Sequence, residues 1–276
     1  MSGTRVEAPL PTFVIGGTMR AGTTSLTRWL RSHPDVLMPA AKELHYFDTR
    51  YEHGDTIDDY RSRFSGWSGE RAVGEATPNY LFHKEAMARL ANALPDARIV
   101  LSLRNPIDRA YSQYWARRSR DIETREFDEV VRTEPDVIVG DDGYVVARGQ
   151  YHEQIQRMLE HIPRERVLVV LFEDVEDEPQ ATFADVCRFI GVDDEIVPTE
   201  IGQAANAHRH FRSQRLRRIG MKLPKPAANA VGRLNSKVET YPPMDPSTRA
   251  WLVERYRPHN AALGDWLGRD LSAWDA

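Results

Sequence analysis

Residues 12–34 read TFVIGGTMRAGTTSLTRWLRSHP, and three patterns follow one another there without a break. A short apolar run with β-branched residues ends in the paired glycines Gly16 and Gly17, which predicts a buried strand. After a segment rich in hydroxyl side chains, apolar residues recur at helical spacing until Pro34 ends the pattern. The sequence therefore predicts a strand, a glycine loop and a helix in succession.

Alternating strand and helix patterns continue through most of the chain. Further strands are predicted in RAVGEAT (71–77), ARIVLSLR (97–104) and RVLVVLFED (166–174). Helices are predicted in HKEAMARLANAL (83–94), PIDRAYSQYWARRSR (106–120), YHEQIQRMLEHI (151–162), PQATFADVCRFIGV (179–192) and MDPSTRAWLVERYRPHNAALGDWLGRDL (244–271), the last capped by Asp245 or Ser247. This alternation is typical of the α/β class, in which helices cover both faces of a central parallel sheet.

Length and composition predict one domain over residues 1–276. The chain is 41% hydrophobic and 28% charged, which suits a single large globular unit. We expect residues 1–11 to be flexible. Periodicity weakens over residues 201–243, which we expect to form a cap or lid over the domain.

The overall charge excludes some partners. With 37 basic and 41 acidic residues the formal charge is −4, so we expect no binding to nucleic acid or to anionic membrane surfaces. The N-terminus lacks the apolar core of a signal peptide, and no transmembrane segment is predicted. The single cysteine, Cys187, has no disulfide partner in the chain, which favours a reducing, cytoplasmic location. The sequence does not indicate an oligomeric state.

The loop between the first strand and the first helix is expected to bind phosphate. At such a junction, backbone N–H groups and the N-terminal end of the helix converge on one place and hold phosphate oxygens. Gly22 lets the backbone approach a ligand closely, and hydroxyl side chains follow it. The expected ligand-binding residues are Arg20, Ala21, Gly22, Thr23, Thr24 and Ser25.

The same loop disfavours a nucleotide-dependent kinase. Gly17 and Gly22 have the spacing of the loop G-x-x-x-x-G-K-[ST], but Thr23 stands where that loop has its lysine. The basic group lies inside the loop instead, as Arg20. Carboxylates that would hold magnesium are not identifiable after the strand in ARIVLSLR. A dinucleotide site is excluded because no G-x-G-x-x-G is present.

Several segments resemble one family in the same order along the chain. These are FVIGGTMRAGTTSL, KELHYFD, GEATPNYL, LRNPIDRAYSQYWARR, GQYHEQIQRML, VLVVLFEDV and VCRFIGV, which together cover about residues 12–200. They resemble the superfamily of sulfotransferases that use 3′-phosphoadenosine 5′-phosphosulfate (PAPS), especially the branch with heparan sulfate sulfotransferases and bacterial homologues. The resemblance implies in-line transfer of a sulfuryl group to a hydroxyl or amine of a small-molecule, glycan or lipid acceptor. The product would be 3′,5′-adenosine bisphosphate (PAP).

The resemblance also implies the roles of individual residues. Arg20 lies in the family's 5′-phosphosulfate loop and would stabilise the leaving phosphate electrostatically. Arg104, at a strand end, and Ser112, eight residues later, match the motif that binds the 3′-phosphate. Glu43 in KELHYFD matches the catalytic glutamate and would accept the proton of the acceptor. His45, on the same face of a predicted extended segment, would orient the acceptor or replace Glu43 as base.

The expected chemistry requires neither a metal nor a proton donor, because a phosphate leaving group is a weak base. A carboxylate beside a partly dry pocket is expected to have a raised pKa, which would suit Glu43 as a base. The basic run over residues 209–222 would supply further contacts to PAPS through Arg209 or Arg212, attract an acidic acceptor, or form a solvated surface.

Other features leave alternatives open. Heparan sulfate sulfotransferases have a lysine where GEATPNYL has Ala76, so a glycosaminoglycan acceptor is less expected. A non-catalytic nucleotide-binding relative stays an alternative, although Arg20 and Glu43 are both present. His208 and His210 indicate a metal site only weakly, because no third ligand is nearby. The aromatic residues of the helix over 106–120 would form core or line an acceptor pocket; they are Tyr111, Tyr114 and Trp115.

Overall fold

The computed structural model describes residues 8–135, 143–202, 209–211, 236–238 and 241–276. Its centre is a five-stranded parallel sheet with the order β2-β3-β1-β4-β5. The strands are β1 (Phe13–Gly17), β2 (Val36–Leu37), β3 (Ala72–Ala76), β4 (Arg98–Leu103) and β5 (Val167–Leu171). The strand order reverses at β1, so the loop after β1 opens at the place where parallel sheets bind ligands.

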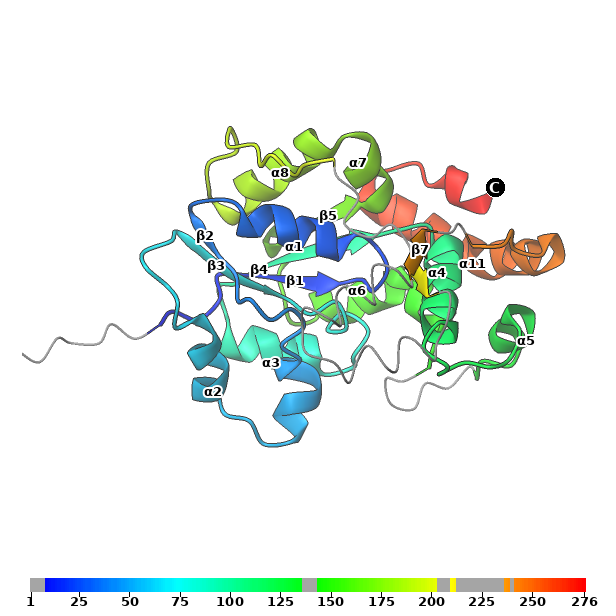
Figure 1. Cartoon of the computed structure of the whole chain (residues 1–276), viewed down its shortest axis with the longest axis horizontal. Helices are drawn as coiled ribbons and strands as arrows, with labels where there is room; N and C mark the ends of the chain where they lie inside the picture. The colour runs from blue at the N-terminus through cyan, green and yellow to red at the C-terminus, as the bar shows by residue number, and fades with distance from the viewer. Residues whose placement is uncertain (1–7, 136–142, 203–208, 212–235, 239–240) are drawn as a thin grey trace, which may run out of the picture.

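Helices cover both faces of this sheet (Figure 1). They are α1 (Thr23–Arg31), α2 (Ile57–Arg61), α3 (Ala86–Ala93), α4 (Pro106–Arg118), α5 (Phe127–Arg132), α6 (Tyr151–Leu159), α7 (Phe172–Asp177), α8 (Pro179–Ile190) and α11 (Pro246–Leu267). Because side chains alternate along a strand, Phe13 and Ile15 of β1 pack with α1 and α8, whereas Val14 packs with α3, α6 and α11. The predicted α/β class with a covered parallel sheet is confirmed.

Most predicted elements are present, with shifts at their ends. The predicted strand RVLVVLFED ends at Leu171, and its last residues begin α7. Gly191 ends α8 in the left-handed conformation, and Asp245 caps α11 by accepting from the backbone N–H groups of Ser247 and Thr248. The sequence pattern did not predict the two-residue strand β2. No helix of the described residues is long and apolar enough to cross a membrane.

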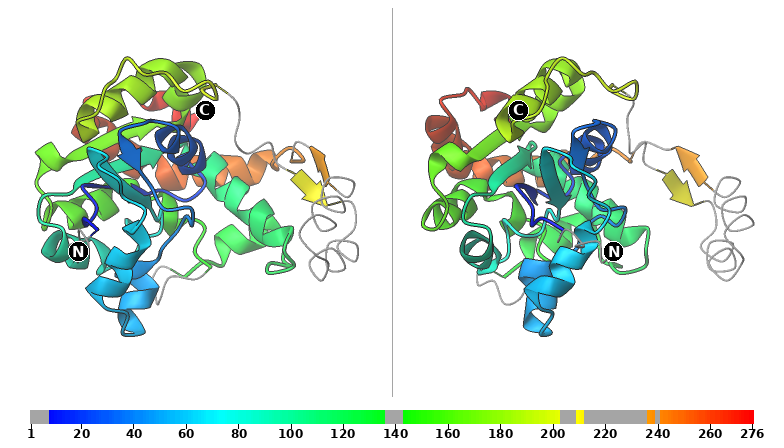
Figure 2. Two further views of the ribbon diagram at one scale, coloured as in Figure 1. Left: turned by 60° about the vertical axis from the view of Figure 1, so that its left-hand side comes forward. Right: turned by 90° about the vertical axis from the view of Figure 1, so that its left-hand side faces the viewer.

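The segment expected to be flexible and the predicted cap are each described only in part. Ala8 and Leu10, in the segment expected to be flexible, pack against the core. Within the predicted cap, β6 (Arg209–Phe211) pairs antiparallel with β7 (Ser236–Val238), and Figure 2 shows this pair set apart from the central sheet. Residues 203–208, 212–235 and 239–240 of the cap lie outside the described residues.

Candidate functional site

The loop after β1 turns sharply into α1. Gly22 adopts the left-handed conformation, with φ of 78°, and a Cβ atom there would lie 2.7 Å from the ring of Phe172. Only glycine fits both the conformation and this close approach. Gly22 also brings no capping side chain, so the first N–H groups of α1 are left to bind a ligand at the helix N-terminus.

Hydrogen bonds fix this loop to the neighbouring strand β4. The backbone N–H of Thr18 donates to the carbonyl of Ser102 at 2.8 Å, and the Thr18 hydroxyl donates to the same carbonyl at 3.1 Å. In return, the Ser102 hydroxyl donates to the carbonyl of Ala21. Ser102 of β4 therefore holds the loop at two points, Thr18 and Ala21, and β4 ends just before Arg104.

Arg20 and Arg104 lie together beside the start of α4. The Arg20 Nε donates to the Ser112 Oγ at 3.0 Å, and an Nη of Arg104 lies 3.4 Å from the Arg20 carbonyl oxygen. The Arg104 guanidinium stacks over Phe172, with 4.6 Å from Cζ to the ring centroid. Burial lowers the pKa of Arg20, and the side chain of Tyr241 opposes that shift. The residues predicted for the two phosphates are thus in direct contact.

These residues border one open cavity of about 440 Å³, a size within the range of small-molecule sites. Five cationic side chains line it, whereas Glu43 and Glu176 are its acidic members. The cationic residues are Arg20, Lys42, Arg104, Arg117 and Arg120. The residues predicted from Arg20 to Ser25 line the cavity except Ala21, which is fully buried and corrects the prediction that its side chain meets the ligand. This charge balance fits a ligand that carries several negative charges.

The segment with Glu43 and His45 is not an extended strand, which corrects the sequence-based prediction. Glu43 and His45 both have positive φ, at 61° and 53°, and the chain then enters a π-helical turn over Tyr46–Arg50. Contacts to β3 and the following turn hold this unusual backbone. The Glu43 N–H donates to the Ala76 carbonyl at 2.9 Å, and the His45 N–H to the Thr77 hydroxyl at 3.4 Å.

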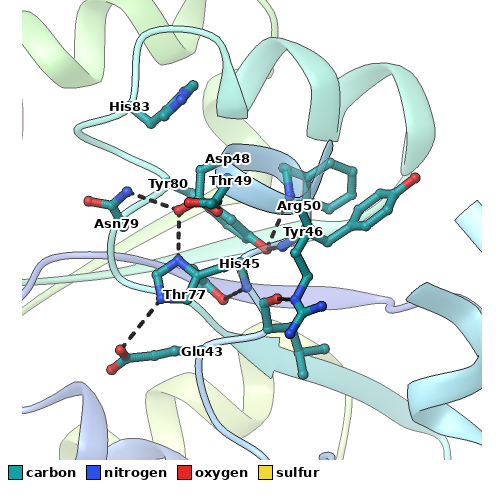
Figure 3. Close-up of polar contacts among 12 residues, drawn as sticks. Glu43, His45, Tyr46, Asp48, Thr49, Arg50, Thr77, Asn79, Tyr80 and His83 are labelled. Atoms are coloured by element: carbon teal, nitrogen blue, oxygen red, sulfur yellow. Dashed lines mark hydrogen bonds and ion pairs between the residues drawn. The ribbon is translucent and has the colours of Figure 1, made fainter. Parts of the chain in front are cut away.

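Glu43, His45 and Asp48 form a chain of ionisable groups (Figure 3). The His45 Nδ1 lies 2.8 Å from an Asp48 oxygen, and its Nε2 lies 3.8 Å from Oε2 of Glu43. The hydrogen bond to Asp48 and then the ion pair with Glu43 raise the pKa of His45 to about 10. A pKa in this range favours the protonated imidazolium at neutral pH, which argues against the alternative that His45 replaces Glu43 as base.

The pKa of Glu43 is shifted in the direction opposite to the one expected from the sequence. The ion pair with His45 lowers the pKa of Glu43, and Lys42 lowers it further, although burial opposes both. The prediction of a raised pKa is wrong because two cationic neighbours outweigh the effect of desolvation. Glu43 is consequently a carboxylate at neutral pH, as an acceptor of a proton must be.

Asp48 anchors this chain inside the protein. Its side chain is fully buried and accepts hydrogen bonds from the Asn79 Nδ2 at 2.9 Å and the Thr49 N–H at 2.6 Å. Burial raises the pKa of Asp48, but the bonds from His45 and Asn79 outweigh it and leave the pKa lowered. The sequence analysis did not identify Asp48 or Asn79, although Asp48 stands in the quoted segment KELHYFD.

Lys42 is a further residue of the site, and its contact with the phosphate loop was not predicted from the sequence. Its Nζ lies 3.0 Å from the Thr24 hydroxyl, 3.3 Å from the Thr23 hydroxyl and 3.3 Å from Oε1 of Glu43. Burial lowers the pKa of Lys42, and Glu43 opposes that shift. The sequence indicates only that Lys42 stands directly before Glu43. Its contact with the phosphate loop depends on the fold.

Some predicted residues lie away from the cavity, and others lie where the structure does not describe the side chain. Tyr111, Tyr114 and Trp115 do not line the cavity but pack among aromatic rings with Phe127, which favours the core alternative. Cys187 is fully buried, as expected for a small apolar side chain. Arg209 and His210 lie in β6, where the structure describes only the backbone, and His208 and Arg212 lie outside the described residues.

Comparison with known proteins identifies one family. The family model for the sulfotransferase domain matches residues 10–221. The chain therefore belongs to the sulfotransferase domain family, which confirms the resemblance and favours sulfuryl transfer over the kinase alternative. A solved sulfotransferase from Alicyclobacillus acidocaldarius is 32% identical with a TM-score of 0.76, over 97% of this chain and 100% of the other.

Curated relatives are longer proteins. The bifunctional heparan sulfate N-deacetylase/N-sulfotransferase 3 of Mus musculus is 30% identical over 96% of this chain and 31% of its own length. The heparan sulfate glucosamine 3-O-sulfotransferase 3B1 of Homo sapiens is 27% identical over 96% of this chain and 65% of its own length. The chain thus spans about a third of the first relative and about two thirds of the second.

Proposed function

We propose that this protein transfers a sulfuryl group from PAPS to a hydroxyl or amino group of an acceptor. The observation that carries the proposal is the single cavity that joins the phosphate loop, Arg104 and Ser112 to the carboxylate of Glu43. Membership of the sulfotransferase domain family supports the same reaction. The donor would supply an activated sulfuryl group, and the chain would supply binding, orientation and electrostatic stabilisation.

The loop and α4 would hold the two phosphorylated ends of the donor. The N–H groups at the start of α1 and the hydroxyls of Thr23 and Thr24 would bind the 5′ end. Arg104 and Ser112 would bind the 3′-phosphate, and a guanidinium is suited to a phosphate because two of its N–H groups can donate side by side. Contact between Arg20 and Ser112 places these two sets of donors next to each other.

Sulfuryl transfer forms a bond from the acceptor oxygen or nitrogen to sulfur while the bond from sulfur to the 5′-phosphate oxygen breaks. The electron pair of the broken bond stays on the phosphate, where negative charge grows. Arg20 would stabilise that charge without giving up a proton, since guanidinium stays protonated in proteins. Because a phosphate leaving group is a weak base, we propose that no metal is required, and EDTA should leave the rate unchanged.

Glu43 would accept the proton that the acceptor loses. Its side chain lines the cavity and is about half exposed, so an acceptor can reach it. His45 would act as a positioning residue that keeps Glu43 ionised and oriented, because its imidazolium lies between Glu43 and the buried Asp48. The acceptor class stays open among small molecules, glycans and lipids; the glycan option is supported by the heparan sulfate relatives.

Two measurements test this proposal. In isothermal titration calorimetry, PAP should bind with EDTA present, and in a separate titration without EDTA, ATP with magnesium should not replace PAP. Incubation with labelled PAPS and a fractionated extract of the source cells should then yield a labelled acceptor. PAP binding without labelling of any fraction would favour the non-catalytic alternative. Magnesium-dependent binding of ATP in place of PAP would favour the kinase.

A further inference from the structure

Lys42 connects the phosphate loop to the proposed base, although it belongs to neither the loop nor α1. A nucleotide-triphosphate loop has a lysine at the position of Thr23, and this chain does not. The fold brings an ammonium group to the start of α1 from another segment, because the Lys42 Nζ reaches the hydroxyls of Thr23 and Thr24 at 3.3 and 3.0 Å.

Three polar groups surround the Lys42 ammonium. Two are the threonine hydroxyls at the start of α1, and the third is Oε1 of Glu43 at 3.3 Å. The Lys42 side chain is only 21% exposed, so its charge is poorly screened by water. The ammonium therefore lies between the groups proposed to hold the 5′ end of the donor and the group proposed to deprotonate the acceptor.

In an in-line reaction, the transferred group passes between the leaving phosphate and the acceptor. We propose that Lys42 is a further catalytic residue, which contacts the sulfuryl oxygens as sulfur moves from the phosphate oxygen to the acceptor. Lys42 stays protonated throughout: the acceptor proton goes to Glu43, and the electron pair of the broken bond goes to the phosphate. This inference rests on the proposed function, and it adds a second cation to Arg20 at the reacting atoms.

A merely structural role for Lys42 makes a different prediction. If Lys42 only formed an ion pair with Glu43, it would orient the base and make no contact with the donor. PAPS and PAP differ by the sulfuryl group, so a direct contact must favour PAPS over PAP. The ratio of the two affinities therefore separates the two roles without any need for turnover.

The experiment compares four chains by calorimetric titration with PAPS and with PAP, with no acceptor present. Lys42→Met removes the charge and keeps the length of the side chain, and Lys42→Arg keeps the charge. Lys84→Met is the matched control, since Lys84 is exposed and does not line the cavity. We expect Lys42→Met to weaken PAPS binding about tenfold relative to PAP, as for the loss of one charged hydrogen bond. Lys42→Arg should restore most of the difference, and Lys84→Met should change neither affinity.

A second background removes the contribution of Glu43. With Lys42 absent, the carboxylate of Glu43 would itself repel the sulfuryl group, so Lys42→Met is repeated in Glu43→Gln. If Lys42→Met still weakens PAPS binding relative to PAP binding in the Glu43→Gln background, the result supports direct contact between Lys42 and the sulfuryl group. Disappearance of that loss, or an equal loss for both ligands in either background, overturns the inference. If the unmodified chain binds neither ligand, the proposed function itself fails.

Discussion

The guanidinium Nε of Arg20 lies 3.0 Å from the hydroxyl oxygen of Ser112, although 92 positions separate the two residues in the sequence. One belongs to the loop after β1, and the other belongs to the second turn of α4. Their contact joins the groups proposed for the 5′ and 3′ ends of the donor into one binding surface. Substitutions on either side should therefore affect both binding and transfer.

Removal of the Arg20 charge should lower kcat more than it lowers PAP affinity. Loss of one donor that stabilises developing negative charge costs about a hundredfold or more in rate. Arg20→Met should show this loss in assays with labelled PAPS, and Arg20→Lys should recover part of it. Arg28→Met is the control, because Arg28 on α1 pairs with the partly exposed Glu200. Arg20→Met with full activity would exclude a role in leaving-group stabilisation.

The pH dependence of transfer should show the lowered pKa of Glu43. The ordinary pKa of this carboxyl is 4.5, and its cationic neighbours shift it downward. The rate should therefore be independent of pH across the neutral range and should fall only in acid below that value. Glu43→Gln should reduce kcat by at least about a hundredfold with PAP affinity retained. An inflection near neutral pH that persists in Glu43→Gln would assign the base to another group.

His45 should make folding stability depend on pH in the alkaline range. Its folded pKa of about 10 exceeds the ordinary value of 6.5, because Asp48 and Glu43 favour the imidazolium. The contribution of His45 is therefore complete below pH 6.5 and is lost as pH rises toward about 10. Urea unfolding between these pH values should show a falling free energy of unfolding. In His45→Gln this slope should be smaller, and an unchanged slope would refute the assignment.

Glu75 should stabilise the segment that carries the site. This fully buried carboxylate accepts hydrogen bonds from the hydroxyls of Thr77, Tyr80 and Tyr60 at 2.6, 2.7 and 3.1 Å. Burial raises the pKa of Glu75 to about 6. Glu75→Leu would leave buried hydroxyls without an acceptor and should destabilise the fold by about 3 kcal/mol in urea unfolding.

Glu75→Gln, which keeps an acceptor oxygen, should be milder than Glu75→Leu. The same hydrogen-bond network reaches the segment that carries Glu43 and His45, because the Tyr80 hydroxyl accepts from the Tyr46 N–H at 2.9 Å. Both variants should therefore lower kcat in the same order as they lower stability. Equal stability of Glu75→Leu and the unmodified chain would contradict a structural role for this carboxylate.

The sequence predicted those parts of the molecule that depend on local patterns. Periodicity and glycine placement were sufficient for β1, β3, β4 and β5, for α1 and for the loop around Gly22. Resemblance to a family identified Arg104, Ser112 and Glu43, which line the same cavity in the structure. The cap over residues 201–243, a cytoplasmic location and the acceptor stay predictions.

The remaining features depend on contacts between distant segments. The left-handed backbone at Glu43 and His45 is held by residues of β3 and the turn after it, so periodicity could not indicate it. The lowered pKa of Glu43 arises from two neighbours whose orientation follows from that backbone. The contact of Lys42 with the phosphate loop was not predicted for the same reason, because its threonine partners lie 18 and 19 positions earlier in the chain.

The most direct test of the account is calorimetric titration of PAP into the unmodified chain and into the double variant Arg104→Ala/Ser112→Ala, with EDTA present. Arg118→Ala is the control, since Arg118 lies on the same helix but outside the cavity and pairs with Glu126. We expect the unmodified chain and the control to bind PAP equally, and the double variant to bind at least about tenfold more weakly. Absence of PAP binding to the unmodified chain, or unchanged affinity in the double variant, would contradict the assignment of this cavity.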